Sequence, residues 1–275
     1  MELIKTISAM KDVRADLKGS IGFIPTMGAI HQGHLSLVDE AKKNDFLIAS
    51  IFVNPTQFGE NEDLESYPQN IKKDLEKFAD YNVDYVFLPT SKQMYPDGFK
   101  SWVTVDKITN ILCGESRPNH FRGVTTIVNK LINIVKPDYM YMGLKDFQQI
   151  VVIETMIKEL NIDTKIVRCP IIREDSGLAM SSRNAYLDSK EKEQATSLYK
   201  SLMYAKQTSK IGDKSSEIIE EIKQRIVSKS GRIDYVKIVD TNSLYDTKII
   251  DKDSHIVLAV FWGNTRLIDN MRIYD

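Results

Sequence analysis

The stretch from Ile24 to His34, with the sequence IPTMGAIHQGH, decides the fold of the first part of the chain. It follows a short apolar run at residues 20–24, which predicts a strand, and it precedes residues 35–43, which predict a helix. Gly28 and Gly33 carry no Cβ, so the backbone between strand and helix can pass close to a ligand. The N–H groups and the positive dipole end at the start of a helix favour an anion. The stretch therefore predicts an anion site, most simply for a phosphate.

Two histidines, His31 and His34, stand three residues apart across the start of that helix. Both rings can point into the anion site and donate hydrogen bonds. A zinc site is the alternative, but zinc needs at least one more protein ligand. The remaining histidines and the cysteines show no ligand spacing: they are Cys113, Cys169, His120 and His255. Either histidine could also be an ordinary packed or surface residue, so the pair alone leaves these alternatives open.

Composition and charge exclude several classes of protein. The chain of 275 residues has 37 basic and 38 acidic residues, a net charge of −1, and no long basic block, so a nucleic-acid or membrane surface is not expected. The longest apolar runs are as short as strands, and the charged N-terminal residues 1–19 do not form a secretory signal. Two cysteines without a pairing pattern fit a reducing compartment. We therefore expect a soluble, cytoplasmic protein.

The first 170 or so residues alternate between strand-like and helix-like segments. This order predicts a Rossmann-like α/β fold with a doubly wound parallel sheet, in which ligands bind beyond the carboxyl ends of the strands. The expected strands are 20–24, 46–53, 83–88, 139–142 and 164–169, and the expected helices are 35–43, 71–81, 124–135 and 147–160.

The pattern changes after about residue 176. Two charge-rich helices are expected at 189–209 and 213–228, followed by strands at 233–239, 255–261 and 266–273. Helices followed by strands predict a smaller α+β domain. We therefore divide the chain into a nucleotide-binding domain, residues 1–176, and a C-terminal lid domain, residues 177–275.

Three further polar loops follow expected strands or the domain boundary. In NPTQF, the amide of Gln57 can read hydroxyl or carboxylate groups, whereas Asn54 could simply begin a turn. In GLKDFQQ, Lys145 suits a phosphate and Asp146 could hold Mg²⁺, but Asp146 and Gln149 could equally cap the next helix.

The last loop is MSSRN, residues 180–184, at the expected domain boundary. Its hydroxyls and the forked guanidinium of Arg183 suit phosphate oxygens, and Gly177 would let the loop move over a bound nucleotide. A solvated linker is the alternative, and composition favours it.

The motifs together, in their order, closely resemble those of the pantothenate synthetase family, the pantoate–β-alanine ligases. The resemblance rests on PTMGAIHQGH, FVNPTQFG with EDLESYP after it, RPNHFRGV, GLKDFQQ and MSSRN. The end of the chain, from DYVKIVD to VFWGNTRLIDN, is similar to the C-terminal domain of that family. The resemblance covers nearly the whole chain, whereas the broader HxGH nucleotidyltransferases share only the first and the last of these motifs.

The resemblance implies a reaction that joins pantoate to β-alanine with ATP and Mg²⁺, through a pantoyl adenylate, releasing AMP and pyrophosphate. It also implies a homodimer. Chemistry agrees with this, because adenylation gives a carboxylate a good leaving group and the developing charge can be stabilised by histidine, lysine, arginine and helix N–H groups. The amine then attacks while it is held in place.

The resemblance also implies roles for individual residues. His34 would be the catalytic proton donor with His31 beside it, and Gln57 and Gln149 would bind pantoate, Gln57 also β-alanine. Asp74 corresponds to an acidic residue near Mg²⁺, and Lys145 and Arg183 would act on the phosphates. The implied ATP-binding positions are Met27, Gly28, Ala29, Ile30, His31, Gln32, Gly33, His34, Gly143, Leu144, Lys145, Asp146, Ile172, Met180, Ser181, Ser182 and Arg183.

Two positions depart from the family pattern: Leu144 stands where glutamate is usual, and Gln69 where arginine is common. We expect these departures to change rate and nucleotide affinity. Two other functions stay open at this point. Another adenylate-forming nucleotidyltransferase would have no use for Gln57 and Gln149 as a pair, and a nucleotide-binding regulator would bind ATP without turnover.

Overall fold

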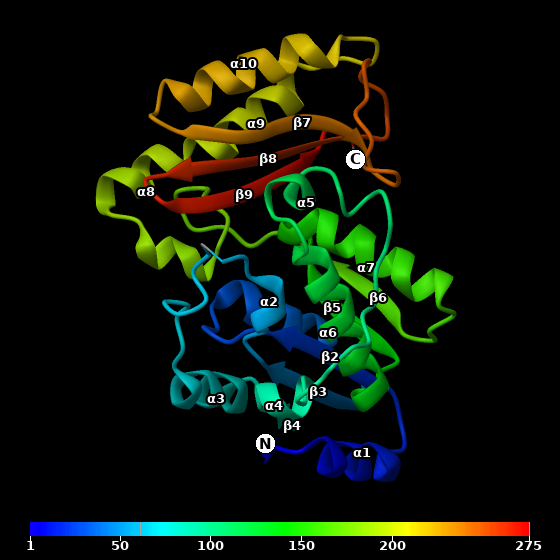
Figure 1. The fold of residues 1–275 in the computed structure, drawn as a ribbon. Coiled ribbons are helices and arrows are strands. Elements are labelled where there is room, and N and C mark those ends of the chain that lie inside the picture. The colour runs from blue at the N-terminus through cyan, green and yellow to red at the C-terminus, as the bar shows by residue number, and fades with distance from the viewer. Residues whose placement is uncertain (61, 275) are drawn as a thin grey trace. The chain divides into compact units, whose positions relative to one another are not determined.

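The computed structural model describes residues 1–60 and 62–274 and divides into two compact units (Figure 1). The first unit comprises Met1–Leu144 and Gln149–Pro170, and the second comprises Lys145–Gln148 and Ile171–Asp275. The second unit thus begins slightly before the expected boundary at residues 176 and 177 and takes in a short earlier segment. The division into functional domains stays a prediction.

The first unit is built on a six-stranded sheet in which every pair of neighbours is parallel. The spatial order is β1-β4-β3-β2-β5-β6. The strands are β1 (Glu2–Ile4), β2 (Ile21–Thr26), β3 (Phe46–Ile51), β4 (Tyr85–Phe87), β5 (Tyr139–Gly143) and β6 (Lys165–Cys169). This arrangement confirms the α/β Rossmann-like prediction. Of the six strands of this sheet, β1 alone was missed, because its three residues do not lie within a longer apolar run, as those of β4 do.

The apolar pattern of the central strands explains their position. In β3 all residues after Phe46 are buried, as expected for a strand covered on both faces. Helix α2 (Gln32–Ala41) places Leu35, Val38 and Ala41 in one apolar cluster with Leu47 and Ala49 of β3. The strand–turn–helix unit around IPTMGAIHQGH is therefore anchored in the core, and its loop is left at the carboxyl end of β2.

The remaining helices of the first unit connect the strands. Helix α6 is longer than expected because it begins at His120 rather than at residue 124, and α1 was not predicted, since its apolar spacing is weak. The helices are α1 (Ile7–Asp16), α3 (Ile71–Asp80), α4 (Ser91–Met94), α5 (Cys113–Ser116), α6 (His120–Val135) and α7 (Phe147–Glu159), with short 3₁₀ turns η1 (Pro55–Gln57) and η2 (Leu144–Asp146). Most of η2 and the first two residues of α7 belong to the second unit.

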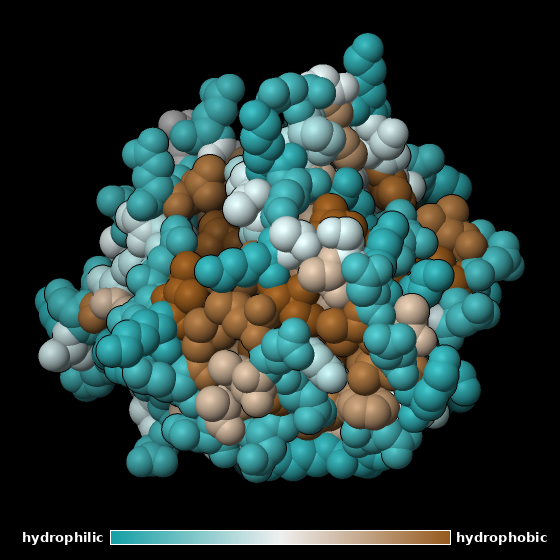
Figure 2. Space-filling view, turned by 90° about the horizontal axis from the view of Figure 1, so that it is seen from below, coloured by the Kyte–Doolittle hydropathy of each residue, from teal (hydrophilic) through white to brown (hydrophobic). Residues whose placement is uncertain are grey.

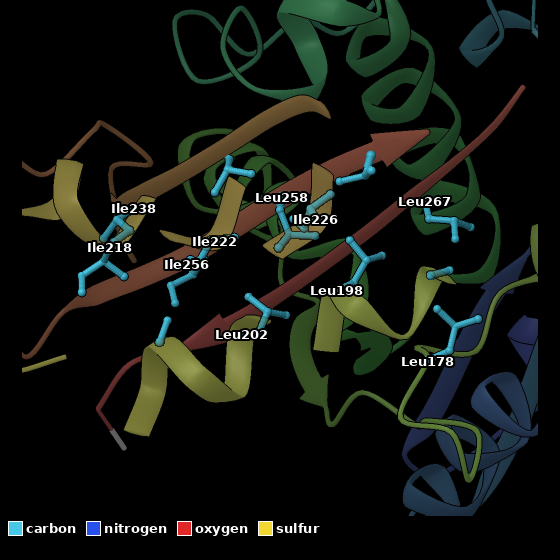
Figure 3. Close-up of a cluster of buried hydrophobic side chains, with 14 of the residues drawn as sticks. Leu178, Leu198, Leu202, Ile218, Ile222, Ile226, Ile238, Ile256, Leu258 and Leu267 are labelled. Carbon is cyan, nitrogen blue, oxygen red and sulfur yellow. The ribbon is translucent and has the colours of Figure 1, made fainter. Parts of the chain in front are cut away.

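The second unit contains a three-stranded antiparallel sheet, β7 (Arg232–Asp240), β8 (Ser254–Trp262) and β9 (Thr265–Arg272). Helices α9 (Ser197–Thr208) and α10 (Ser215–Val227) pack on it through a cluster of leucine and isoleucine side chains, including Leu198 and Ile222 (Figure 3). This confirms the α+β prediction for the end of the chain. The unit also contains η3 (Ser182–Tyr186) and α8 (Ser189–Ala195).

The expected single helix over residues 189–209 is instead two helices, α8 and α9, which meet at Thr196. The backbone N–H and the hydroxyl of Thr196 both bond to the carbonyl of Glu193, which tightens the last turn of α8. In the part of the chain that the structure describes, no helix is long and apolar enough to cross a membrane.

Candidate active site

The two histidines of the first loop hold each other in place at the start of α2. The Nδ1 atom of His31 accepts a hydrogen bond from the backbone N–H of Gly33 at 3.1 Å, and Nδ1 of His34 accepts one from the N–H of His31 at 3.4 Å. Their ring centroids lie 4.1 Å apart. Because an Nδ1 that accepts a hydrogen bond does not carry a proton, these contacts place the ring proton of each histidine on Nε2. Each ring is therefore set up as an Nε2–H donor at a helix N-terminus.

The loop before the histidines is held by a buried carboxylate. Asp74, in the first turn of α3, accepts hydrogen bonds from the N–H groups of Ala29 at 2.9 Å and Ile30 at 2.8 Å. Ala29 has a left-handed backbone with φ 52°, and a Cβ at Gly28 would lie 3.0 Å from the Asp74 carboxylate. The ammonium of Lys77 donates to the carbonyl of Ile30. The carboxylate thus fixes an unusual loop conformation that only a glycine at position 28 allows.

This geometry bears on the expected magnesium role of Asp74. The side chain is buried, and each of its oxygens already accepts a backbone hydrogen bond. Within residues 1–60 and 62–274, no three histidine, cysteine or acidic side chains gather into a group that could hold a metal ion. The magnesium role of Asp74 stays a prediction, whereas its contacts to the loop are a finding.

Gln57 lies beside the histidine loop and is oriented by Asn54. The amide of Gln57 donates to the sulfur of Met27 at 3.1 Å and accepts from Asn54 Nδ2 at 3.0 Å. Asn54 is buried and also bonds to the carbonyl of Gly123 and to the hydroxyl of Tyr95. Asn54 therefore does more than begin a turn: it sets the direction of the Gln57 amide and brings the second loop next to the first.

Helix α6 supports the backbone of the same loop. A Cβ at Gly123 would lie 2.3 Å from the carbonyl oxygen of Thr56, so only glycine allows this approach. His120 Nδ1 donates to the carbonyl of Gln57 at 2.8 Å, and an Nη atom of Arg117 contacts the same oxygen at 3.3 Å. The RPNHFRG segment thus holds the backbone from which the Gln57 side chain projects.

Arg117 is itself fixed by a two-point ion pair with Glu62, with N–O distances of 2.7 and 2.5 Å. Burial alone would raise the pKa of Glu62, but the hydrogen bond and positive charge of Arg117 outweigh burial and lower it below its ordinary value. The carboxylate is therefore kept ionised next to the guanidinium.

The second unit carries the other residues for which the sequence predicts phosphate contacts. The ammonium of Lys145 lies 3.5 Å from the carboxylate of Asp146, and both side chains are partly exposed. The capping role considered for Asp146 and Gln149 at the start of α7 stays a prediction.

The expected adenine and triphosphate segments of the second unit belong to one hairpin. Ile172 accepts a backbone hydrogen bond from Met180 at 2.9 Å, and Gly177 turns the chain between them with φ 89°. The ring of Tyr199 leaves no room for a Cβ at Gly177, so the glycine serves the turn itself; loop movement stays a prediction.

After the hairpin, Ser181 caps η3 by accepting from the N–H of Arg183 at 3.3 Å. Buried Asn184 donates to Glu174 at 2.7 Å and to the carbonyl of Ala179 at 3.1 Å. The MSSRN loop is therefore attached to the hairpin rather than being an unstructured linker.

The structure brings together Met27–His34, Gln57 and Asp74 in the first unit, where hydrogen bonds join Met27 to Gln57 and Ala29 to Asp74. Lys145, Asp146 and residues 172–183 belong to the second unit. Gly143, Leu144 and Gln149 belong to the first unit. Sequence reasoning missed the supporting residues Arg117, His120, Gly123 and Glu62. The motif RPNHFRGV contained most of them, but nothing local indicated what they contact.

A parallel α/β sheet with two histidines at a helix N-terminus is an arrangement typical of proteins that bind nucleotides. Its family follows from comparison: the sequence model for pantoate-beta-alanine ligase matches residues 2–272, and the chain belongs to that family. A pantothenate synthetase from Thermosipho africanus is 50% identical over 278 residues, covering 99% of this chain and 100% of the relative. One from Acetivibrio thermocellus is 49% identical over 98% of this chain and 99% of its own length.

Solved structures agree with this family. A pantothenate synthetase from Thermus thermophilus matches with a TM-score of 0.95 at 35% identity over 100% of both chains. A pantoate-beta-alanine ligase from Francisella tularensis, complexed with beta-gamma ATP and β-alanine, matches with a TM-score of 0.85 at 38% identity over 99% of this chain and 98% of that chain. The chain is accordingly an ATP-using ligase of pantothenate biosynthesis that joins pantoate and β-alanine.

Proposed function

We propose that this ligase works through a pantoyl adenylate. His31 and His34 would donate hydrogen bonds to the phosphate oxygens of ATP. A carboxylate oxygen of pantoate attacks the α-phosphorus of ATP, a new P–O bond forms, and the bond to the bridging oxygen breaks, releasing pyrophosphate. The observation that carries the proposal is the pair of Nε2–H donors at the start of α2, which suits phosphate oxygens that gain negative charge.

Lys145 and Arg183 would share the stabilisation of the triphosphate. Lys145 offers a compact ammonium and Arg183 a planar fork of donors, both suited to phosphate oxygens. The capped turn at Ser181 and the anchoring of Asn184 support a defined path for residues 180–183. The remaining ATP contacts are those that the family resemblance assigns to Met27–Gly33, residues 143–146 and Ile172.

Gln57 and Gln149 would bind the two acids that react. An amide both donates and accepts, so it can hold the hydroxyl and carboxylate groups of pantoate without adding charge. The fixed orientation of Gln57, set by Asn54 and by Arg117 and His120 on its backbone, supports this role. By binding pantoate and β-alanine, these amides would hold the acyl group and the amine in position for the second step.

In that second step the amine of β-alanine attacks the acyl carbon of the adenylate. A C–N bond forms, the C–O bond to AMP breaks, and the nitrogen gives up a proton. The step needs no nucleophilic side chain, because the adenylate already supplies the leaving group and positioning supplies most of the rate.

Magnesium would enter as the complex that ATP forms with it. Mg²⁺ is usually held by substrate phosphates and one or two carboxylates. Each oxygen of Asp74 already accepts a hydrogen bond from a backbone N–H group of the histidine loop, so this side chain holds the loop, and its role near Mg²⁺ stays a prediction. We therefore assign no step of the reaction to a metal held by Asp74.

We further propose a homodimer working in the cytoplasm. On the face that Figure 2 shows, apolar residues gather near the centre within a polar surround, as is typical of an interaction surface.

Cys113 and Cys169 are both buried thiols rather than a disulfide, which suits a reducing compartment.

The transfer of a carboxylate oxygen from pantoate to AMP tests whether the reaction passes through an adenylate. With pantoate labelled by ¹⁸O in its carboxylate, the proposed route transfers one labelled oxygen to AMP in each turnover, which mass spectrometry of AMP detects. Unlabelled AMP, or release of ADP and labelled phosphate, would overturn the adenylate and point to an acyl phosphate.

A further inference from the structure

The segment Lys145–Gln148 packs as part of the second unit, although the residues on both sides of it belong to the first. The lysine proposed to meet the phosphates therefore takes its position from the C-terminal sheet. The contacts of that sheet with the segment show which side chains fix it.

Asn270, buried in β9, donates from Nδ2 to the backbone carbonyl of Lys145 at 3.0 Å. A carbonyl oxygen only accepts, so the amide nitrogen must face Lys145 and the amide oxygen must face the other way. That oxygen lies 2.9 Å from Nε2 of His255 in β8. His255 therefore carries a proton on Nε2 and donates it to Asn270.

His255 also contacts the segment directly. Its ring stacks on that of Phe147 with centroids 3.9 Å apart and an interplanar angle of 5°. In the sheet, Asn270 pairs with Val257, two residues along β8 from His255, so the two polar side chains are diagonal neighbours. Two residues of the sheet thus hold the segment at Lys145 and at Phe147.

The surroundings of Asn270 are also fixed. Its backbone N–H donates to Asp269 at 2.8 Å, and Asp269 forms a two-point ion pair with Arg173 at 2.6 and 2.9 Å. Burial raises the pKa of Asp269, while the charges of Arg173 and Lys145 act in the opposite direction, so the Lys145 ammonium lies within the field of this carboxylate.

A buried histidine and asparagine cost desolvation that an apolar pair in the same sheet would avoid. Their hydrogen bonds form one chain, from His255 Nε2 through the amide of Asn270 to the backbone carbonyl of the proposed phosphate lysine. We propose that Asn270, oriented by His255, is a positioning residue for Lys145 in the ligase reaction. The proposal rests on the role of Lys145 given above.

The test is a double-mutant cycle between Lys145→Ala and Asn270→Asp, with ATP–pyrophosphate exchange in the presence of pantoate as the readout. Asn270→Asp keeps the shape but removes the donor to the carbonyl. We expect it to slow exchange by about 10–100-fold, since small misplacement of a catalytic group has effects of this size, while the KM for β-alanine is unchanged. In the Lys145→Ala background the same substitution should have no further effect.

Two variants of His255 separate positioning from folding. His255→Phe keeps a ring against Phe147 but removes the hydrogen-bond donor to Asn270, so it should slow exchange as Asn270→Asp does. If Asn270→Asp does not fold, His255→Phe takes its place in the double-mutant cycle. His255→Gln restores a donor and should recover most of the exchange rate. Asp234→Asn, which breaks an ion pair with Arg266 in the same sheet, is the matched control and should exchange normally.

Three results would overturn the inference. The first is equal slowing of exchange by Asn270→Asp in the wild-type and Lys145→Ala backgrounds. The others are normal exchange in Asn270→Asp and an exchange rate in His255→Gln as low as that of His255→Phe. Normal exchange in Lys145→Ala itself would instead refute the proposed role of Lys145. The two failures are therefore distinguishable.

Discussion

Asp74 Oδ1 accepts a 2.8 Å hydrogen bond from the backbone N–H of Ile30, although the two residues lie 44 positions apart in the chain. With the second bond, from Ala29, this carboxylate holds the loop that presents His31 and His34. The acidic residue that family resemblance places near magnesium thus shapes the histidine loop through hydrogen bonds.

Asp74→Ala should therefore weaken ATP binding by the histidine loop and also lower the stability of the fold. Two backbone N–H groups lose their acceptors, which lowers the free energy of unfolding by about 1–3 kcal/mol for each group left buried. The KM for ATP should rise at every Mg²⁺ concentration. Urea unfolding and ATP kinetics across a Mg²⁺ titration check this, and full recovery of the KM by added Mg²⁺ would assign Asp74 to the metal instead.

His34→Asn separates the structural from the chemical role of this ring. The asparagine amide can still accept from the N–H of His31, but the Nε2–H donor is lost. Adenylate formation should fall by about 10²–10⁴-fold, as for a lost acid or transition-state donor, with unchanged thermal unfolding. Asp39→Asn on the exposed face of α2 is the control; near-normal turnover of His34→Asn would refute the assignment.

Much of this arrangement could be predicted from sequence because its signals are local. The buried run of β3 and the turn IPTMGAIHQGH each lie within one strand or one turn, so periodicity and glycine chemistry were sufficient. The position of the Gln57 backbone could not be predicted. Its carbonyl accepts a hydrogen bond from His120, which is 63 residues away in the chain and is brought close only by the packing of α6.

The same limit applies to the second unit. The bond from Asn270 to Lys145 spans 125 residues, and no spacing in the sequence indicates it. The break at Thr196 was missed for another reason: charge-rich helical spacing continues through it, whereas the backbone N–H and the hydroxyl of Thr196 bond to the carbonyl of Glu193 at the end of α8.

Gln57→Ala should weaken substrate binding without stopping chemistry. Losing one or two hydrogen bonds of about 0.5–1.5 kcal/mol each predicts a rise of roughly 3–10-fold or more in the KM for pantoate and for β-alanine. Pyrophosphate exchange at saturating pantoate should stay close to normal. Steady-state kinetics with each substrate varied check this, and unchanged KM values would show that Gln57 contacts neither acid.

The ion pair of Glu62 with Arg117 predicts a pH dependence of stability. The pKa of Glu62 is lower in the folded protein than its ordinary value of 4.5, so the unfolded chain binds the proton more tightly. The contribution is complete above about pH 4.5 and is lost as the pH falls through the folded pKa. Glu62→Gln should remove it, so the difference in unfolding free energy between wild type and variant should shrink on acidification. A difference independent of pH between about 3 and 6 would contradict this.

The most direct test of the central claim is exchange of labelled pyrophosphate into ATP, with Mg²⁺, with and without pantoate. Reversible formation of a pantoyl adenylate predicts exchange only when pantoate is present and without any need for β-alanine. Exchange without pantoate, or no exchange with it, would contradict the adenylate mechanism proposed for this site.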